Sequence, residues 1–177
     1  MRWLIEHVGR HRPIVRVGVV AAFLICTVGA AVPARGVAAS APTCSPSKLR
    51  LDKVGEDDFT SHRGLNFAVR NVSPQTCRLK GFAGLRLLDA NARAMPTAVS
   101  HFGGPAHPVV IAPWHRAFFS VTFAVSGPCP SAVFAYGMRF VPPGASSGLV
   151  WYEGRFDLCG PGPAAVNVSP FAFPREF

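Results

Sequence analysis

Apolar and polar positions alternate repeatedly along the chain after residue 40. Leu65, Phe67 and Val69 fall on one side of an extended segment, while polar residues occupy the other side. This alternation is typical of a β-strand with one buried face. Because no apolar repeat of 3.6 residues continues for three turns, the pattern predicts an all-β domain. The expected strands number about eight and lie at 49–54, 65–69, 85–89, 109–111, 119–125, 136–141, 151–156 and 166–173.

Turn-forming residues separate these segments. The chain contains 17 glycines and 17 prolines, and they gather with Asn, Asp and Ser where chain reversals are expected. The predicted turns lie at 71–74, 89–91, 103–105, 126–128, 142–148 and 160–163. Short strands joined by such turns favour two antiparallel sheets packed face to face. We therefore expect residues 40–177 to form a single immunoglobulin-like β-sandwich.

The first 39 residues have the features of an export signal. Arginines flank an uncharged apolar segment, residues 17–34, which we expect to form a hydrophobic signal helix. The small residues Val37, Ala38 and Ala39 favour cleavage before Ser40. An alternative is an uncleaved membrane anchor with the domain outside, because 18 residues are at the lower limit for crossing a bilayer. Either interpretation predicts an extracellular or cell-envelope location.

Four cysteines follow this segment: Cys44, Cys77, Cys129 and Cys159. An even number in an exported chain indicates two disulfides among three connectivities. The midpoint between Cys44 and Cys77 falls in the polar stretch 55–64, and that between Cys129 and Cys159 falls in the turn at 142–148. Two hairpins would therefore bring together Cys44 with Cys77 and Cys129 with Cys159. A four-cysteine zinc site is the alternative, although no Cys-x-x-Cys pair supports it.

Several short motifs resemble one known family. They include Cys44 with Leu49, the segment 71–73 leading to Cys77, and Ile111-Ala112-Pro113, where Trp114 stands in place of a family glycine. From Cys44 to about Phe173 the arrangement resembles the exported actinobacterial proteins described as domain of unknown function 4232. The resemblance implies a secreted or envelope-attached β-sandwich with no assigned activity.

Charge and motifs exclude several classes of function. The net charge is +9, but residues 1–39 carry five of the arginines, and the others are scattered rather than clustered. This distribution argues against nucleic-acid binding. Arginines that alternate with apolar residues are interpreted as a solubilising sheet face. No His-Glu-x-x-His motif and no phosphate-binding loop occurs, so we expect neither an enzyme nor a cofactor.

One loop region combines imidazoles with aromatic surface, and we expect any binding site there. Its candidate residues are His101, Phe102, His107, Trp114 and His115. The expected function is a non-catalytic binding module for an envelope protein, a glycan or a lipid. Membrane attachment through residues 17–34 would accompany this function if the signal is retained. The alternatives are an extracellular metal-binding protein, with calcium at 56–58 as one variant, and an unfamiliar hydrolase that uses the loop histidines.

Overall fold

The computed structural model of this chain describes residues 41–125, 132–159 and 164–172. The strands and the single 3-10 helix of this part are η1 (Pro46–Lys48), β1 (Leu49–Asp58), β2 (His62–Asn71), β3 (Cys77–Leu79), β4 (Gly84–Leu88), β5 (Thr97–His101), β6 (Val109–Ile111), β7 (Arg116–Ala124), β8 (Ala132–Val141), β9 (Leu149–Cys159) and β10 (Ala164–Val168). No helix within these ranges has the length and apolar character needed to span a bilayer. The predicted signal, residues 1–39, lies outside the described residues.

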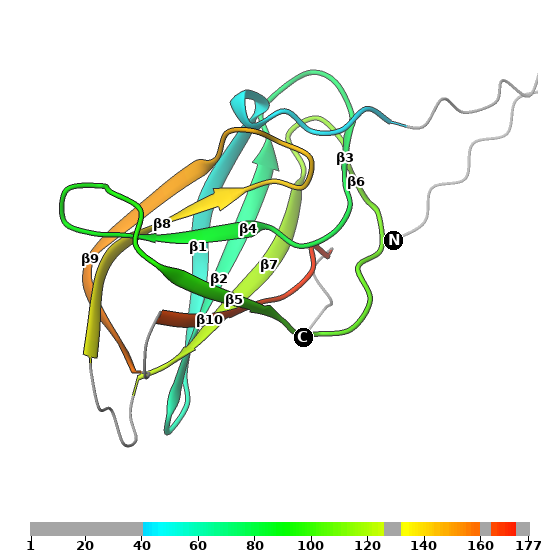
Figure 1. The fold of residues 1–177 in the computed structure, drawn as a ribbon. Helices are drawn as coiled ribbons and strands as arrows, with labels where there is room; N and C mark the ends of the chain where they lie inside the picture. Colours follow the sequence, from blue (N-terminus) through cyan, green and yellow to red (C-terminus); the bar gives the residue numbers. More distant parts are fainter. Residues whose placement is uncertain (1–40, 126–131, 160–163, 173–177) are drawn as a thin grey trace, which may run out of the picture. The chain divides into compact units, whose positions relative to one another are not determined.

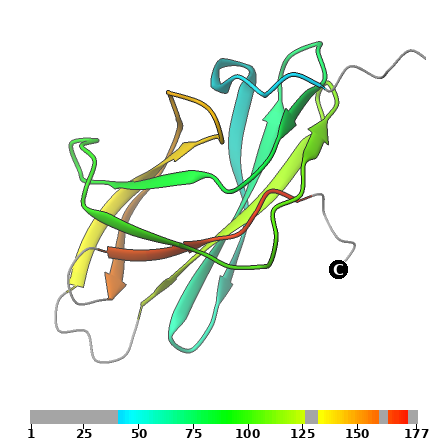
Figure 2. The same ribbon diagram turned by 45° about the vertical axis from the view of Figure 1, so that its right-hand side comes forward.

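Two larger sheets lie face to face (Figure 1, Figure 2). The first has the strand order β1-β2-β7-β10-β5, and the second has the order β4-β8-β9. Neighbouring strands are antiparallel except β10 and β5, which are parallel. A small antiparallel sheet pairs β3 with β6. The all-β sandwich prediction is confirmed.

Aromatic rings from both sheets meet in the core. The ring of Phe67 on β2 lies 5.5 Å from Phe119 on β7 and 4.8 Å from Phe140 on β8. All three side chains are buried, and each contributes about 2 to 3 kcal/mol through burial. The buried set Leu65, Phe67 and Val69 confirms the face assigned from alternation. These contacts hold the two sheets in a fixed relation and so position both outer surfaces.

The structure contains strands that the sequence pattern did not reveal. β3 has only three residues, and β5 lies at the edge of its sheet with mostly exposed side chains, so neither leaves a clear apolar alternation. β1 and β2 also extend into the polar stretch 55–64, where we expected a loop. Glu56, for example, pairs with Leu65. Polar side chains are compatible with a strand there because they are exposed while the backbone remains paired.

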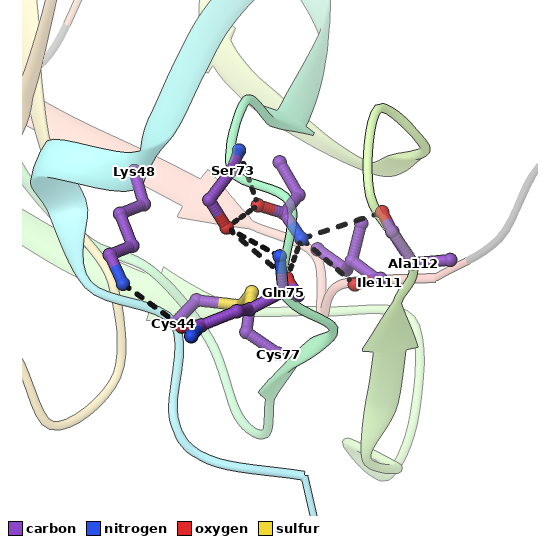
Figure 3. The surroundings of a disulfide bond; sticks show 8 residues. Cys44, Lys48, Ser73, Gln75, Cys77, Ile111 and Ala112 are labelled. Atoms are coloured by element: carbon purple, nitrogen blue, oxygen red, sulfur yellow. Dashed lines mark hydrogen bonds between the residues drawn. A yellow bond between two sulfur atoms is a disulfide. The ribbon is translucent and has the colours of Figure 1, made fainter.

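One predicted disulfide is present, between Cys44 and Cys77 (Figure 3). Their Cα atoms are 4.9 Å apart, and the hairpin of β1 and β2 brings them together as expected. A bond across 33 residues stabilises the fold by about 4 kcal/mol in the chain-entropy model. Cys129 lies outside the described residues, so its pairing with Cys159 stays a prediction. Cys159 itself lies opposite Ala132 at the open end of the β8–β9 hairpin, which is the position expected for it in a Cys129–Cys159 disulfide.

A buried asparagine ties the end of β2 to two neighbouring segments beside this disulfide. The Asn71 side-chain amide donates hydrogen bonds to the carbonyl oxygens of Gln75 (2.7 Å) and Ile111 (3.1 Å). Its Oδ1 accepts hydrogen bonds from the Ser73 N–H (3.0 Å) and hydroxyl (2.8 Å). Figure 3 shows Ser73, Gln75 and Ile111 around this network. Every hydrogen-bonding atom of the Asn71 side chain is thereby used, as burial demands.

Candidate functional site

The structure places the first half of the predicted binding loop at the end of β5. The His101 ring stacks on Phe82, with the ring centroids 4.0 Å apart. The Phe102 N–H donates to the Val168 carbonyl oxygen at 3.2 Å, and its side chain is partly exposed. His107 is exposed in the chain between β5 and β6. These residues form a rim along the β5 edge rather than a closed site.

The second half of that loop lies in the turn before β7. Trp114 has a φ of +66°, a left-handed conformation that costs a non-glycine residue about 1 to 2 kcal/mol. Its N–H donates to the Asn71 carbonyl oxygen at 2.8 Å, and the Asn71 N–H donates to the His115 carbonyl oxygen at 3.0 Å. The Trp114 side chain is nevertheless 64% exposed. The fold thus fixes the backbone of this turn while leaving the indole in solvent.

No hydrogen bond, ion pair or ring contact among the described residues joins these two groups. Within the same residues, no cluster of three His, Cys, Asp or Glu side chains could hold a metal ion. The acidic residues 56–58, considered above for calcium, have other partners. Glu56 pairs with Lys53 and Arg63, and Asp57 accepts a hydrogen bond from Asn66 at 2.7 Å. The predicted binding loop of His101, Phe102, His107, Trp114 and His115 stays a prediction.

Charged side chains bridge the two edge strands β1 and β9. The register of β1 shifts at Val54, and residues 153–155 of β9 have no partner on β8. Such bulges redirect side chains and interrupt a sheet edge. The Lys53 Nζ forms ion pairs with Glu153 Oε1 at 2.5 Å and with Glu56 Oε2 at 2.6 Å. This edge cluster joins one sheet to the other.

The edge cluster is electrostatically satisfied. Hydrogen bonds from Arg63 and then Lys53 lower the pKa of Glu56 from 4.5 to about 2. Burial alone would lower the pKa of Lys53, but the hydrogen bonds and charges of Glu153 and Glu56 together outweigh it and raise that pKa. A carboxylate with so low a pKa is ionised at neutral pH and holds no proton to donate. The arrangement suits edge protection better than acid catalysis.

An open cleft of about 710 Å³ adjoins this edge cluster, lined by residues that include Glu56, Asp58, Arg63 and Arg155. Its lining carries both positive and negative groups, and Arg155 pairs with Asp157 at 3.3 Å. A cleft whose charges neutralise one another gives a charged ligand little net attraction.

Exposed apolar side chains gather on the solvent side of the β4-β8-β9 sheet. Phe134, Val150 and Tyr152 are 42%, 42% and 51% exposed, and we name this group the aromatic sheet face. A Cβ atom at Gly137 would lie 2.6 Å from the Tyr152 ring, so the ring lies against the backbone of β8. Glycine at this position lets the tyrosine lie flat on the sheet with its other side in solvent.

Three arginines adjoin the aromatic sheet face: the Arg155 guanidinium lies 3.9 Å from the centroid of the Phe134 ring, and the other two are Arg86 and Arg139. Arg86 on β4 lies directly opposite Arg139 on β8, and Arg139 lies opposite Val150 on β9. Neither arginine forms an ion pair within the described part of the chain. Since alternate residues of β4 and β8 are buried, these arginines point to the same outer surface as Tyr152.

A second group of opposed cations crosses the other sheet. Arg50 on β1 lies opposite Arg70 on β2, and Arg70 lies opposite Arg116 on β7. We name these three residues the arginine row. Asp52 is the acidic neighbour, at 3.4 Å from Arg50 and 3.9 Å from Arg70. Like charges directly opposite on neighbouring strands destabilise a sheet, so the arginine row lowers the stability of this sheet. A bound anion would offset that cost.

The arginine row adjoins the Trp114 turn. Arg116 follows that turn by one residue, and Arg70 precedes Asn71, to which the turn is hydrogen bonded. The Arg70 Nε is buried and has no hydrogen-bond partner among the described residues. The sequence shows that these arginines alternate with apolar residues, but the cross-strand register that aligns them follows only from the folded chain.

The comparisons with known proteins identify a family and no individual relative. The family model described as domain of unknown function (DUF4232) matches residues 44–172. No curated protein and no solved structure matches the chain.

Proposed function

This chain belongs to the DUF4232 family, whose description names no activity. From its surface we propose that it is an exported, non-catalytic binding module that captures a partner on the aromatic sheet face. The module acts in the cell envelope or the extracellular space. Its partner is an envelope protein, a glycan or a lipid-bearing molecule.

Export is supported by the N-terminal sequence and by the disulfide. Arginines precede the uncharged segment 17–34, and small residues follow it at 37–39. The Cys44–Cys77 bond suits an oxidising compartment, where small domains gain stability from disulfides. Cleavage before Ser40 releases the domain, and retention of the segment keeps it at the membrane.

The observation that carries the proposal is the exposure of Phe134, Val150 and Tyr152 on one sheet surface. Exposed apolar groups gathered on one surface mark interaction sites. Tyrosine and phenylalanine are enriched at such sites, and Tyr supplies a large contact area at low entropic cost. A rigid sheet presents these side chains in one orientation, which favours a specific partner over general adhesion.

A photo-cross-linking residue placed at Val150 tests the proposal in cells that export the protein. A matched probe at Phe59, which is 63% exposed at the tip of the β1–β2 hairpin, controls for nonspecific capture. We expect one recurrent adduct from position 150 that is absent from position 59. Identical adducts from both positions, or none from position 150, would contradict the proposal. Turnover of the captured partner would instead identify an enzyme.

A further inference from the structure

We propose that the arginine row and Trp114 form a surface that docks on an anionic lipid bilayer. This surface lies on the other sheet from the aromatic sheet face, and the inference goes beyond partner capture. It accounts for two costly features together: opposed arginines and an exposed tryptophan in a left-handed conformation.

The charge of this surface calls for an anionic partner. Three guanidinium groups face a single carboxylate, that of Asp52, whereas Lys53 and Arg63 share two carboxylates in the edge cluster. Guanidinium groups match phosphate oxygens in geometry and bind them through paired hydrogen bonds. Headgroup phosphates would therefore separate the opposed cations and relieve their repulsion.

Trp114 favours a bilayer over a dissolved anion. The indole is 64% exposed and adjoins His115 and Arg116, which are also exposed. Tryptophan is enriched where headgroups meet lipid chains, and basic side chains bind the surface of anionic membranes. A free phosphate ion would engage the arginines and leave the indole without a partner. The bilayer interface accommodates both.

The described chain begins at the end of the sheet that carries this surface. The Arg78 N–H donates to the Pro42 carbonyl oxygen at 2.8 Å, and Cys44 is bonded to Cys77. The start of the described chain, the end of β2 and the start of β7 therefore lie at one end of the sheet (Figure 1). Between Ala34 and Ala41 an extended chain spans at most about 25 Å. A retained segment would hold this end near the bilayer, and a cleaved protein would bind through the surface alone.

The test uses the exported, disulfide-bonded protein with vesicles of phosphatidylcholine, with and without phosphatidylglycerol. The readouts are the blue shift of indole fluorescence and its quenching by spin-labelled lipid, each scored as the part that is lost in Trp114→Ala, because Trp3 and Trp151 also fluoresce. We expect both effects with anionic vesicles, and we expect the Trp114→Ala variant to lose them. The double variant Arg50→Gln with Arg116→Gln should lower the affinity for anionic vesicles by about 30-fold, taking about 1 kcal/mol for each basic residue at an anionic surface.

The matched control is Arg86→Gln with Arg139→Gln, which removes two charges from the other sheet. It should retain the vesicle response, and thermal unfolding should show that both double variants are folded. Equal responses to neutral vesicles, equal losses in the two double variants, or binding of inorganic phosphate without vesicles would each overturn the inference. If the arginine-row variant still captures its partner through a photo-cross-linker at position 150, partner binding and vesicle binding are separate properties.

Discussion

Replacing Gly137 with alanine should destabilise the domain and disturb the aromatic sheet face. The new Cβ would lie 2.6 Å from the Trp151 carbonyl oxygen and 2.6 Å from Tyr152 Cδ1. Both distances are about 0.8 Å short of the 3.4 Å at which ordinary contact begins. The carbonyl belongs to the neighbouring strand β9, so relief requires the two strands to separate or the tyrosine ring to leave the sheet.

Overpacking of this kind costs about 1 to 3 kcal/mol, and we expect 2 to 3 kcal/mol because a backbone atom is involved. Gly84→Ala is the matched control on the same sheet, since its Cβ would meet Val141 at an ordinary 3.5 Å. That control should gain about 0.4 to 1 kcal/mol from reduced freedom of the unfolded chain. Urea unfolding measures both free energies. Equal stabilities for the two variants would refute the packing argument for Gly137.

Three further perturbations test the fold and the edge cluster. Cys44→Ser with Cys77→Ser should lower the free energy of urea unfolding by about 4 kcal/mol, and an unchanged midpoint would contradict this. Asn71→Ala should cost about 2 to 4 kcal/mol in the same assay because buried donors and acceptors lose partners, whereas Asn91→Ala, in an exposed turn, should cost little. The pKa of Glu56 is lowered to about 2, so its stabilisation is present above pH 4.5 and lost as the pH falls toward 2. Wild type and Glu56→Gln should therefore differ by about 1 kcal/mol near pH 7, after allowance for solvent screening, and converge near pH 2. A constant difference across this range would show that the carboxylate pairing is not responsible.

Local patterns predicted the parts of this fold that depend on neighbouring residues. The alternation at 65–69 identified a buried face, and the turn at 142–148 joins β8 to β9 as expected. The Cys44–Cys77 bond followed from the symmetry of a single hairpin. In each case the strands involved are adjacent in the chain, so the turn alone sets their register.

Features that join distant strands were not predictable in the same way. Arg70 and Arg116 lie opposite one another although 46 residues separate them in the chain, and alternation places each on an outer face without aligning them. The bulge that brings Glu153 to Lys53 likewise depends on contact between two sheets. From sequence these arginines were interpreted as solubilising. Their register distinguishes a row of opposed charges from a dispersed polar surface.

The most direct test of the account compares partner capture by the exported wild type and by a variant with Phe134→Ser, Val150→Ser and Tyr152→Ser. All three residues are between 42% and 51% exposed and lie outside the core, so the variant should fold, and its thermal unfolding must confirm this. Affinity purification from crosslinked cells should recover one recurrent partner with the wild type and lose it with the variant. Undiminished capture by the folded variant would contradict the claim that the aromatic sheet face is the binding surface.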